Sequence, residues 1–176
     1  LEESEILGNY SKRGVQKIVP QKDGLWICMA PTGSGKTEAA LLRHSQKNER
    51  LIFLLPTIST TNAMMSRISE IYKNKKITTA VLGHSAAFLE DFFNKSNNNE
   101  SYEDCGLTST EFTHWNGARL SAVVNIASID QMVIASLPGK WTHLRLLCLA
   151  NAHIIIDEVH LMDHYQLELL RPLLQF

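Results

Sequence analysis

The stretch "LWICMAPTGSGKTEAA", residues 25–40, is the part of the sequence that predicts the fold. It begins with an apolar run at 25–30, typical of a buried strand, and passes through a glycine-bearing turn into a helix opened by residues 35–37. Gly33 and Gly35 allow the backbone to wrap closely around an anion. Because the amides and dipole at the start of a helix favour phosphate, the stretch predicts a nucleotide phosphate site of the P-loop type.

Each residue of this loop has an expected task. Lys36 is expected to reach the β- and γ-phosphates of ATP, and Thr37 is expected to hold the accompanying Mg²⁺. The predicted nucleotide-binding residues of the loop are Thr32, Gly33, Ser34, Gly35, Lys36 and Thr37. The alternative is an ordinary glycine turn, against which the strand–loop–helix context argues. The usual first glycine of a P-loop is replaced by Ala30, a form that resembles motif I of superfamily 2 helicases.

Strand and helix patterns alternate along the rest of the chain. Further buried strands are predicted at 51–55, 78–82, 122–126 and 153–156, and helices at 35–45, 60–72, 129–137, 143–150 and 164–174. We expect Thr60 or Thr61 to cap the second helix. Alternation at this pitch predicts an α/β fold, a RecA-like P-loop NTPase domain with a mostly parallel sheet flanked by helices.

The last strand leads into "HIIIDEVHLMDHY", residues 153–165. In a P-loop protein an apolar strand that ends in two acids is expected to complete the nucleotide site. Asp157 is then predicted to help hold Mg²⁺, largely through water, and Glu158 to polarise the attacking water.

A transition-metal site is the rival interpretation of the same stretch, because His160 and His164 are four residues apart. The H-E-x-x-H order and an H-D dipeptide are both missing from it. The presence of a P-loop favours the nucleotide interpretation, and His153 and His164 are then expected to be solvated surface residues.

Composition sets broad limits. The chain has 176 residues, 44% of them hydrophobic and 20% charged, with a net charge of −1, so any nucleic-acid partner must be argued from local sites. Its three cysteines are widely spaced, and no apolar run approaches the ~18 residues of a membrane helix, which together favour a cytoplasmic protein with no membrane partner. The Asn-rich region 94–114 is expected to be an exposed or disordered loop.

The D-E-V-H sequence is a DExH box and, with "APTGSGKT", resembles superfamily 2 helicases and translocases. Three longer stretches resemble the CRISPR-associated helicase of type I systems: "LLPTISTTNAMMSRI" (54–68), "IASIDQMV" (126–133) and "HLRLLCLANAHIIIDEVHLMD" (143–163). The resemblance implies the ATP-binding motor lobe of a protein that uses ATP to translocate along and unwind DNA during type I CRISPR interference. Its implied partners are single-stranded DNA, a Cascade-type surveillance complex, and an HD nuclease in cis or in trans.

The resemblance also implies roles for individual residues. Gln16 matches the glutamine that reads adenine, and His160 would link the nucleotide site to later motifs; the alternative for Gln16 is a solvent-facing helix residue. Lys36, Asp157, Glu158 and His160 form the implied catalytic set, and Thr37 and Asp157 the metal set. Pro56, Thr57, Asp130 and Gln131 are expected on the DNA-facing rim.

We interpret residues 1–176 as the first RecA-like lobe of a longer helicase, since the HD nuclease and second RecA-like lobe of the family are not recognisable in the sequence. The family's S-A-T strand, normally between the P-loop and DExH strands, is also missing, so we expect an incomplete sheet. The chain alone is therefore expected to bind nucleotide at best and to be inactive in hydrolysis. The alternatives are a DExH RNA helicase or restriction-type DNA translocase, a P-loop phosphotransferase, and a non-catalytic docking lobe.

Overall fold

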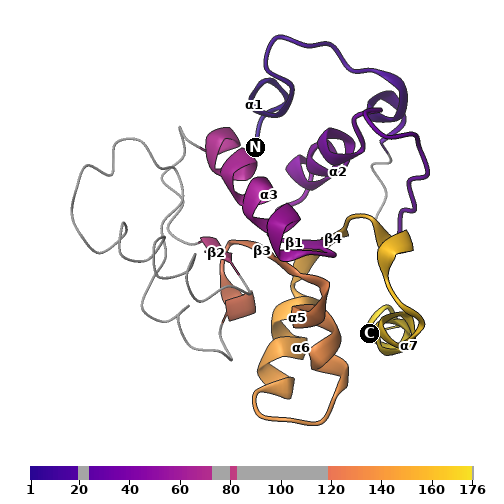
Figure 1. The fold of residues 1–176 in the computed structure, drawn as a ribbon. Helices are drawn as coiled ribbons and strands as arrows, with labels where there is room; N and C mark the ends of the chain where they lie inside the picture. The colour runs from indigo at the N-terminus through magenta and orange to yellow at the C-terminus, as the bar shows by residue number, and fades with distance from the viewer. Residues whose placement is uncertain (20–23, 73–79, 83–118, 176) are drawn as a thin grey trace, which may run out of the picture. The chain divides into compact units, whose positions relative to one another are not determined.

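A computed structural model describes residues 1–19, 24–72, 80–82 and 119–175 (Figure 1). The chain forms two compact units, residues 1–49 and residues 50–176. The predicted loop at 94–114 lies outside the described residues. No helix in the described part is long and apolar enough to cross a membrane.

The first unit consists of short helices around the P-loop helix. Helix α1 (Glu3–Leu7) and the 3-10 helix η1 (Gly14–Ile18) both contact α2 (Lys36–Ser45). The predicted helix at 35–45 is confirmed, because α2 begins directly after Gly35. Ile6 and Leu7 of α1 and the middle of α2 are buried, which gives the unit a small apolar centre.

The predicted strand at 25–30 is not formed. Side chains in this segment alternate in exposure: Leu25, Ile27 and Met29 are 75%, 73% and 91% exposed, whereas the residues between them are half-buried. A strand needs hydrogen-bonded neighbours, and the described residues of the first unit contain no strand to supply them. The period-two pattern is therefore present in an extended segment without the ladder that would make it a strand.

The second unit is built on a parallel sheet whose strand order is β2-β3-β1-β4. The strands are β1 (Arg50–Leu55), β2 (Ala80–Leu82), β3 (Val124–Ser128) and β4 (Ala152–Ile156). Leu51 pairs with Val124 on one side and with His153 on the other, so β1 is an interior strand. Four predicted strands are thus confirmed, although β3 begins two residues later than expected because its ladder to β1 starts at Val124.

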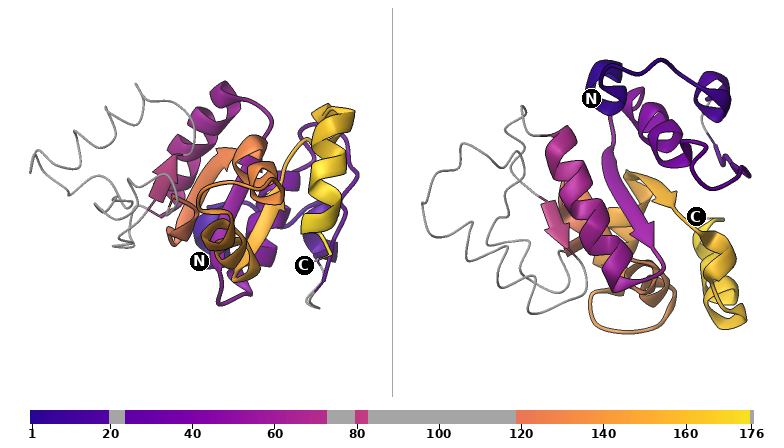
Figure 2. Two further views of the ribbon diagram at one scale, coloured as in Figure 1. Left: turned by 90° about the horizontal axis from the view of Figure 1, so that it is seen from below. Right: turned by 45° about the horizontal axis from the view of Figure 1, so that its top comes forward.

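Helices cover both faces of this sheet (Figures 1 and 2). Helix α3 (Ile58–Ile71) lies on one face, and α5 (Ile129–Val133) and α6 (Thr142–Ala150) lie on the other. Helix α7 (His164–Leu173) packs against α5 and η4 (Ile134–Ser136). The shorter 3-10 helices η3 and η5 span Arg119–Ser121 and Val159–Leu161. The predicted helices at 60–72, 143–150 and 164–174 are thus confirmed, whereas the predicted helix at 129–137 is divided into α5 and the 3-10 helix η4. The fold is the expected α/β architecture.

Strand β1 supplies the centre of the core. Ile52 and Leu54 belong to a buried cluster that includes residues of α5, α6 and α7. Because successive side chains of a strand point to opposite faces, Leu51 and Phe53 face the α3 side, and both are almost completely buried.

The cap of α3 differs from the prediction. The helix begins at Ile58, so its N-cap is Thr57 and not Thr60 or Thr61. The Thr57 hydroxyl accepts a hydrogen bond from the Thr60 amide (3.3 Å), and the Thr60 hydroxyl accepts one from the Thr57 amide (3.3 Å). A threonine that follows the end of β1 almost at once is the earliest residue able to cap, and the helix starts there.

Candidate nucleotide and nucleic-acid site

The P-loop in the first unit turns on two glycines with left-handed backbone. Gly33 has φ 76° and Gly35 has φ 82°, and Gly35 is the N-cap of α2. L-residues with a Cβ adopt such values only at a cost. The glycines therefore allow the chain to reverse tightly and start a helix at Lys36, as the sequence predicts.

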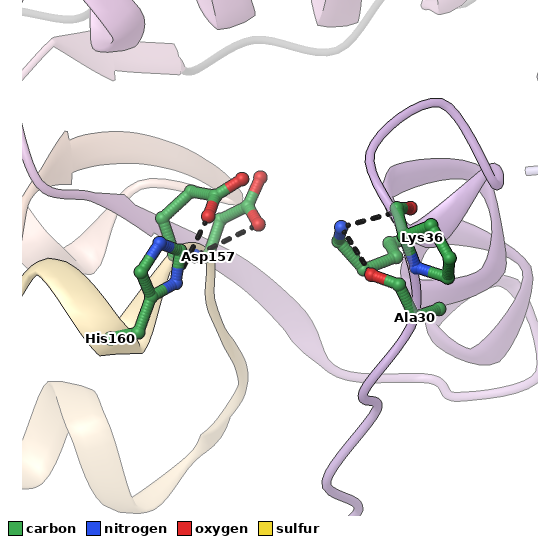
Figure 3. Close-up of polar contacts among 6 residues, drawn as sticks. Ala30, Lys36, Asp157 and His160 are labelled. Atoms are coloured by element: carbon green, nitrogen blue, oxygen red, sulfur yellow. Dashed lines mark hydrogen bonds and ion pairs between the residues drawn. The ribbon is translucent and has the colours of Figure 1, made fainter.

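Lys36 folds back over the beginning of this loop (Figure 3). Its Nζ donates to the carbonyl of Ala30 (2.9 Å) and to the carbonyl of Pro31 (3.3 Å). The Ser34 hydroxyl oxygen is buried and has no hydrogen-bond partner among the described residues. An ammonium group held over the loop and an orphaned hydroxyl within it fit the binding of a phosphate group.

Gln16 packs directly against the P-loop within the first unit. It is 9% exposed, its Oε1 accepts from the Arg13 amide (2.9 Å), and its Nε2 donates to the Gly35 carbonyl (3.5 Å). A Cβ placed on Gly35 would collide with Gln16 Nε2. The alternative of a solvent-facing residue is therefore wrong for Gln16; its predicted contact with adenine remains a prediction.

The D-E-V-H sequence forms a tight turn at the end of β4 in the second unit. The Asp157 amide donates to the Leu54 carbonyl (2.9 Å), which extends the ladder between β1 and β4 by one bond. The Asp157 Oδ1 accepts from the Glu158 amide (2.9 Å). Glu158 itself has φ 51° and ψ 42°, a left-handed conformation that is uncommon for glutamate and that starts η5.

The side chains of this turn also contact each other. His160 Nδ1 lies 3.2 Å from Glu158 Oε2. The His160 side chain lies beside the acids of this turn in Figure 3. The two half-exposed acids and the exposed histidine thus form one polar group at the end of a strand. Strained backbone of this kind is common where a side chain must be aimed at a ligand.

Parallel pairing brings the other predicted residues to the same edge of the sheet. Leu55, the last residue of β1, is paired with Ser128, the last residue of β3, and β4 ends alongside them. Pro56 and Thr57 follow β1, Asp130 and Gln131 follow β3, and Asp157 follows β4. In parallel α/β sheets, ligands bind at the carboxyl ends of strands.

Asp130 and Gln131 are engaged in contacts inside the protein. Asp130 Oδ1 accepts from Gln166 Nε2 (2.9 Å), and the carbonyl and Oε1 of Gln131 lie 3.4 Å and 3.5 Å from the Arg145 guanidinium. Gln166 was not identified from the sequence. The sequence does contain a signal for Gln166, because the D-x-x-Q spacing from Asp163 is typical of a capping box.

Among the residues that the structure describes, no three histidine, cysteine, aspartate or glutamate side chains gather as a metal site. His164 is exposed, as predicted, whereas His153 is half-buried on β4 and not a solvated surface residue. A site for Mg²⁺ needs fewer protein ligands, because this ion keeps several waters and binds with nucleotide phosphates.

A P-loop opening a helix and a parallel strand that ends in D-E-V-H define a nucleotide-dependent helicase domain. The profile of the DEAD/DEAH box helicase family matches residues 12–175, and the chain belongs to that family.

Within the family, the chain is similar to Cas3, the CRISPR-associated helicase. It is 30% identical over 183 residues to the CRISPR-associated endonuclease/helicase Cas3 of Escherichia coli (strain K12), across 94% of this chain and 20% of that protein. It is 30% identical over 177 residues to the CRISPR-associated nuclease/helicase Cas3 of Streptococcus thermophilus, across 89% of this chain and 19% of that protein.

Solved structures agree with these relatives. The crystal structure of T. fusca Cas3 matches with a TM-score of 0.79 at 26% identity, over 97% of this chain and 21% of that one. The structure of T. fusca Cas3-ATP matches with a TM-score of 0.74 at 26% identity, over 98% of this chain and 20% of that one. The resemblance to the CRISPR-associated helicases is confirmed, and the chain spans about a fifth of the length of these relatives.

Proposed function

We propose that the chain is the ATP-binding motor lobe of a CRISPR-associated DNA helicase. The observation that carries the proposal is the P-loop, in which Gly35 starts α2 in a left-handed conformation and Lys36 is held over the loop by two carbonyls. On binding ATP, Lys36 would exchange these neutral acceptors for phosphate oxygens, which form stronger, charge-assisted hydrogen bonds. Ser34 would supply its unpaired hydroxyl, and the likeness to T. fusca Cas3-ATP supports ATP as the nucleotide.

Thr37 and Asp157 are the residues that would hold Mg²⁺, which would neutralise charge on the phosphates. Glu158 is proposed to orient and polarise the attacking water. His160, 3.2 Å from Glu158, is proposed to hold that carboxylate and to connect it with other parts of the helicase. Gln16, fixed against Gly35, is proposed to read adenine by using the amide group, which both donates and accepts.

In the whole protein, ATP hydrolysis would drive translocation along single-stranded DNA and its unwinding in type I CRISPR interference. The rim formed by Pro56, Thr57, Asp130 and Gln131 is the proposed contact with the DNA. A Cascade-type surveillance complex and an HD nuclease, in cis or in trans, are the proposed partners, and the cytoplasm the proposed location. The names of the Cas3 relatives, which describe CRISPR-associated nuclease/helicases, support the CRISPR, helicase and nuclease parts of this proposal.

Nucleotide binding is tested by the affinity of the chain for a fluorescent ATP analogue, with and without Mg²⁺. We expect Lys36→Ala to lower the affinity at least about tenfold, because a charge-assisted contact is worth roughly 1.5–3 kcal/mol. Lys47→Ala, on the same unit but beyond the end of α2, is the matched control. Equal affinity of the two variants would reject the proposed phosphate site. Steady ATP turnover by residues 1–176 that Lys36→Ala abolishes would reject the expected inactivity of the chain alone.

The nucleic-acid part requires the full-length protein. We expect single-stranded DNA to stimulate its ATPase more than RNA of the same length, and Glu158→Gln to abolish the turnover. Preference for RNA would indicate an RNA helicase, and phosphorylation of a small molecule without any nucleic-acid effect would indicate a P-loop phosphotransferase.

A further inference from the structure

The D-E-V-H turn is joined to α7 by a very short connection. Glu158 starts η5, the Leu161 amide donates to the Glu158 carbonyl (2.9 Å), and Met162 is buried in the core. Asp163 then caps α7 through a hydrogen bond from the Gln166 amide to its Oδ1 (2.7 Å). The position of the first turn of α7 therefore constrains the position of Glu158.

The side chain of Gln166 uses both ends of its amide. Its Oε1 accepts from the Asp163 amide (3.2 Å), which completes the capping box of α7. Its Nε2 donates to Asp130 Oδ1 (2.9 Å), a residue 36 positions earlier in the sequence. Asp130 lies in the first turn of α5, directly after β3.

A capping box needs only an acceptor at this position, and glutamate serves as well as glutamine. Glutamate has no donor for Asp130 and would set a second carboxylate against it. The contact with Asp130 therefore requires glutamine, whereas the cap alone does not.

We propose that Gln166 is a positioning residue that couples the D-E-V-H turn to the start of α5 through its side-chain amide. The inference rests on the proposed function, in which the start of α5 lies at the DNA and Glu158 acts on the nucleotide. DNA that moves the first turn of α5 moves Asp130, and Gln166 passes this displacement to the cap of α7 and so to Glu158.

The test reverses the polarity of the contact in the full-length protein. Gln166→Glu places two carboxylates together and removes the donor, whereas Asp130→Asn keeps a side-chain oxygen to which the Gln166 amide still donates and so serves as the control for loss of the Asp130 charge. The double variant restores one amide and one carboxylate with their places exchanged. The measurement is ATPase activity against the concentration of a single-stranded oligothymidylate, which gives the unstimulated rate, the maximal stimulation and the half-saturating concentration. Glu168→Gln is the control, because Glu168 pairs with Arg171 on α7 itself (3.1 Å).

We expect Gln166→Glu to keep the unstimulated rate and to shift the half-saturating DNA concentration or the stimulation about fivefold. This corresponds to one net hydrogen bond of about 1 kcal/mol. The double variant is expected to recover most of the loss. A merely structural cap would leave the stimulation unchanged in Gln166→Glu, since glutamate still caps α7.

Two outcomes would overturn the proposal, and they are distinguishable. If DNA stimulates the wild-type protein and Gln166→Glu behaves like Glu168→Gln, or the double variant is no better than Gln166→Glu alone, the coupling is wrong and the proposed function stands. If DNA does not stimulate the wild-type ATPase at all, the nucleic-acid part of the proposed function fails and the coupling fails with it.

Discussion

Replacement of Gly35 by alanine separates two physical reasons for a glycine at the start of α2. Its φ of 82° costs a residue with a Cβ roughly 1–2 kcal/mol. In addition, the new Cβ would collide with Gln16 Nε2 and lie 3.1 Å from Gln16 Cδ. Because Gln16 is 9% exposed, its amide has little room to move away.

Substitution of Gly33 separates the cost of the left-handed backbone from the cost of the collision with Gln16. Gly33 also has a left-handed backbone, but there is open space around the position of its Cβ. Gly33 has φ 76° and nothing within 4 Å of its Cβ position, so Gly33→Ala carries only the backbone cost of about 1–2 kcal/mol. Gly35→Ala additionally displaces Gln16 from its contacts with Arg13 and Gly35, each worth about 0.5–1.5 kcal/mol. We expect Gly35→Ala to destabilise by about 2–5 kcal/mol in total.

The assay is a double-mutant cycle with Gln16→Ala, read by urea unfolding followed by circular dichroism and by affinity for a fluorescent ATP analogue. In the Gln16→Ala background, Gly35→Ala should cost no more than Gly33→Ala, which corresponds to a coupling energy of about 1–3 kcal/mol. The cost of Gly33→Ala should be the same in both backgrounds. A coupling energy between Gly35 and Gln16 near zero would refute the packing of Gln16 against the P-loop.

Three further predictions concern the second unit. Arg50→Ala should lower the free energy of unfolding, measured by urea unfolding, by about 2–4 kcal/mol. The reason is that the Arg50 guanidinium donates to the carbonyls of Leu120 (3.0 Å) and Cys148 (2.7 Å), which lie on separate segments. The control Arg171→Ala removes an exposed ion pair and should cost less than about 1 kcal/mol. Thr57→Val should cost about 1 kcal/mol in the same measurement by removing the cap of α3, and Thr57→Ser should restore most of it; equal stability of the two variants would contradict this assignment. Glu158→Gly should raise the free energy of unfolding by about 0.5–1 kcal/mol, because glycine tolerates the φ of 51° at this position. The same variant should abolish ATPase activity in the full-length protein, because the carboxylate is lost. Glu158→Ala, which keeps a Cβ, should be inactive without being more stable.

Local patterns in the sequence predicted the fold well where the determinants are themselves local. The glycines that begin α2 and the acids that end β4 lie where the motifs indicate, because a P-loop and a strand-end turn are formed by adjacent residues. The parallel order β2-β3-β1-β4 puts the residues after β1, β3 and β4 on one edge, as alternation of strands and helices predicts.

The contacts that the sequence did not reveal are between distant segments. The hydrogen bond from Gln166 to Asp130 spans 36 residues and depends on the packing of α7 against α5. Similarly, Gln16 touches Gly35 across 19 residues of chain. Spacing alone identifies the capping box at Asp163, but only the tertiary arrangement shows what the free end of the Gln166 amide contacts.

The segment 25–30 differs from its prediction for a related reason. Its apolar residues satisfy the pattern of a buried strand, yet a strand exists only when neighbours accept and donate its backbone hydrogen bonds. In the second unit, β4 is paired with β1 on one side, and four of its five residues are half-buried, whereas five of the six residues of β1 are buried. Each unit thus contains an apolar segment that lacks a strand neighbour on at least one side among the described residues.

The P-loop keeps its geometry although the strand before it is not formed, because its contacts are local. The loop is held by Gly33, Gly35, Gln16 and the carbonyls that Lys36 contacts, all within residues 1–49. Arg43 adds a hydrogen bond to the Gly24 carbonyl (2.6 Å) and a cation–π contact with Trp26 (5.6 Å), which fasten the extended segment to α2 without a sheet. The geometry of the P-loop is therefore set by the local turn and helix, whereas Leu25, Ile27 and Met29 in the segment before it are left exposed.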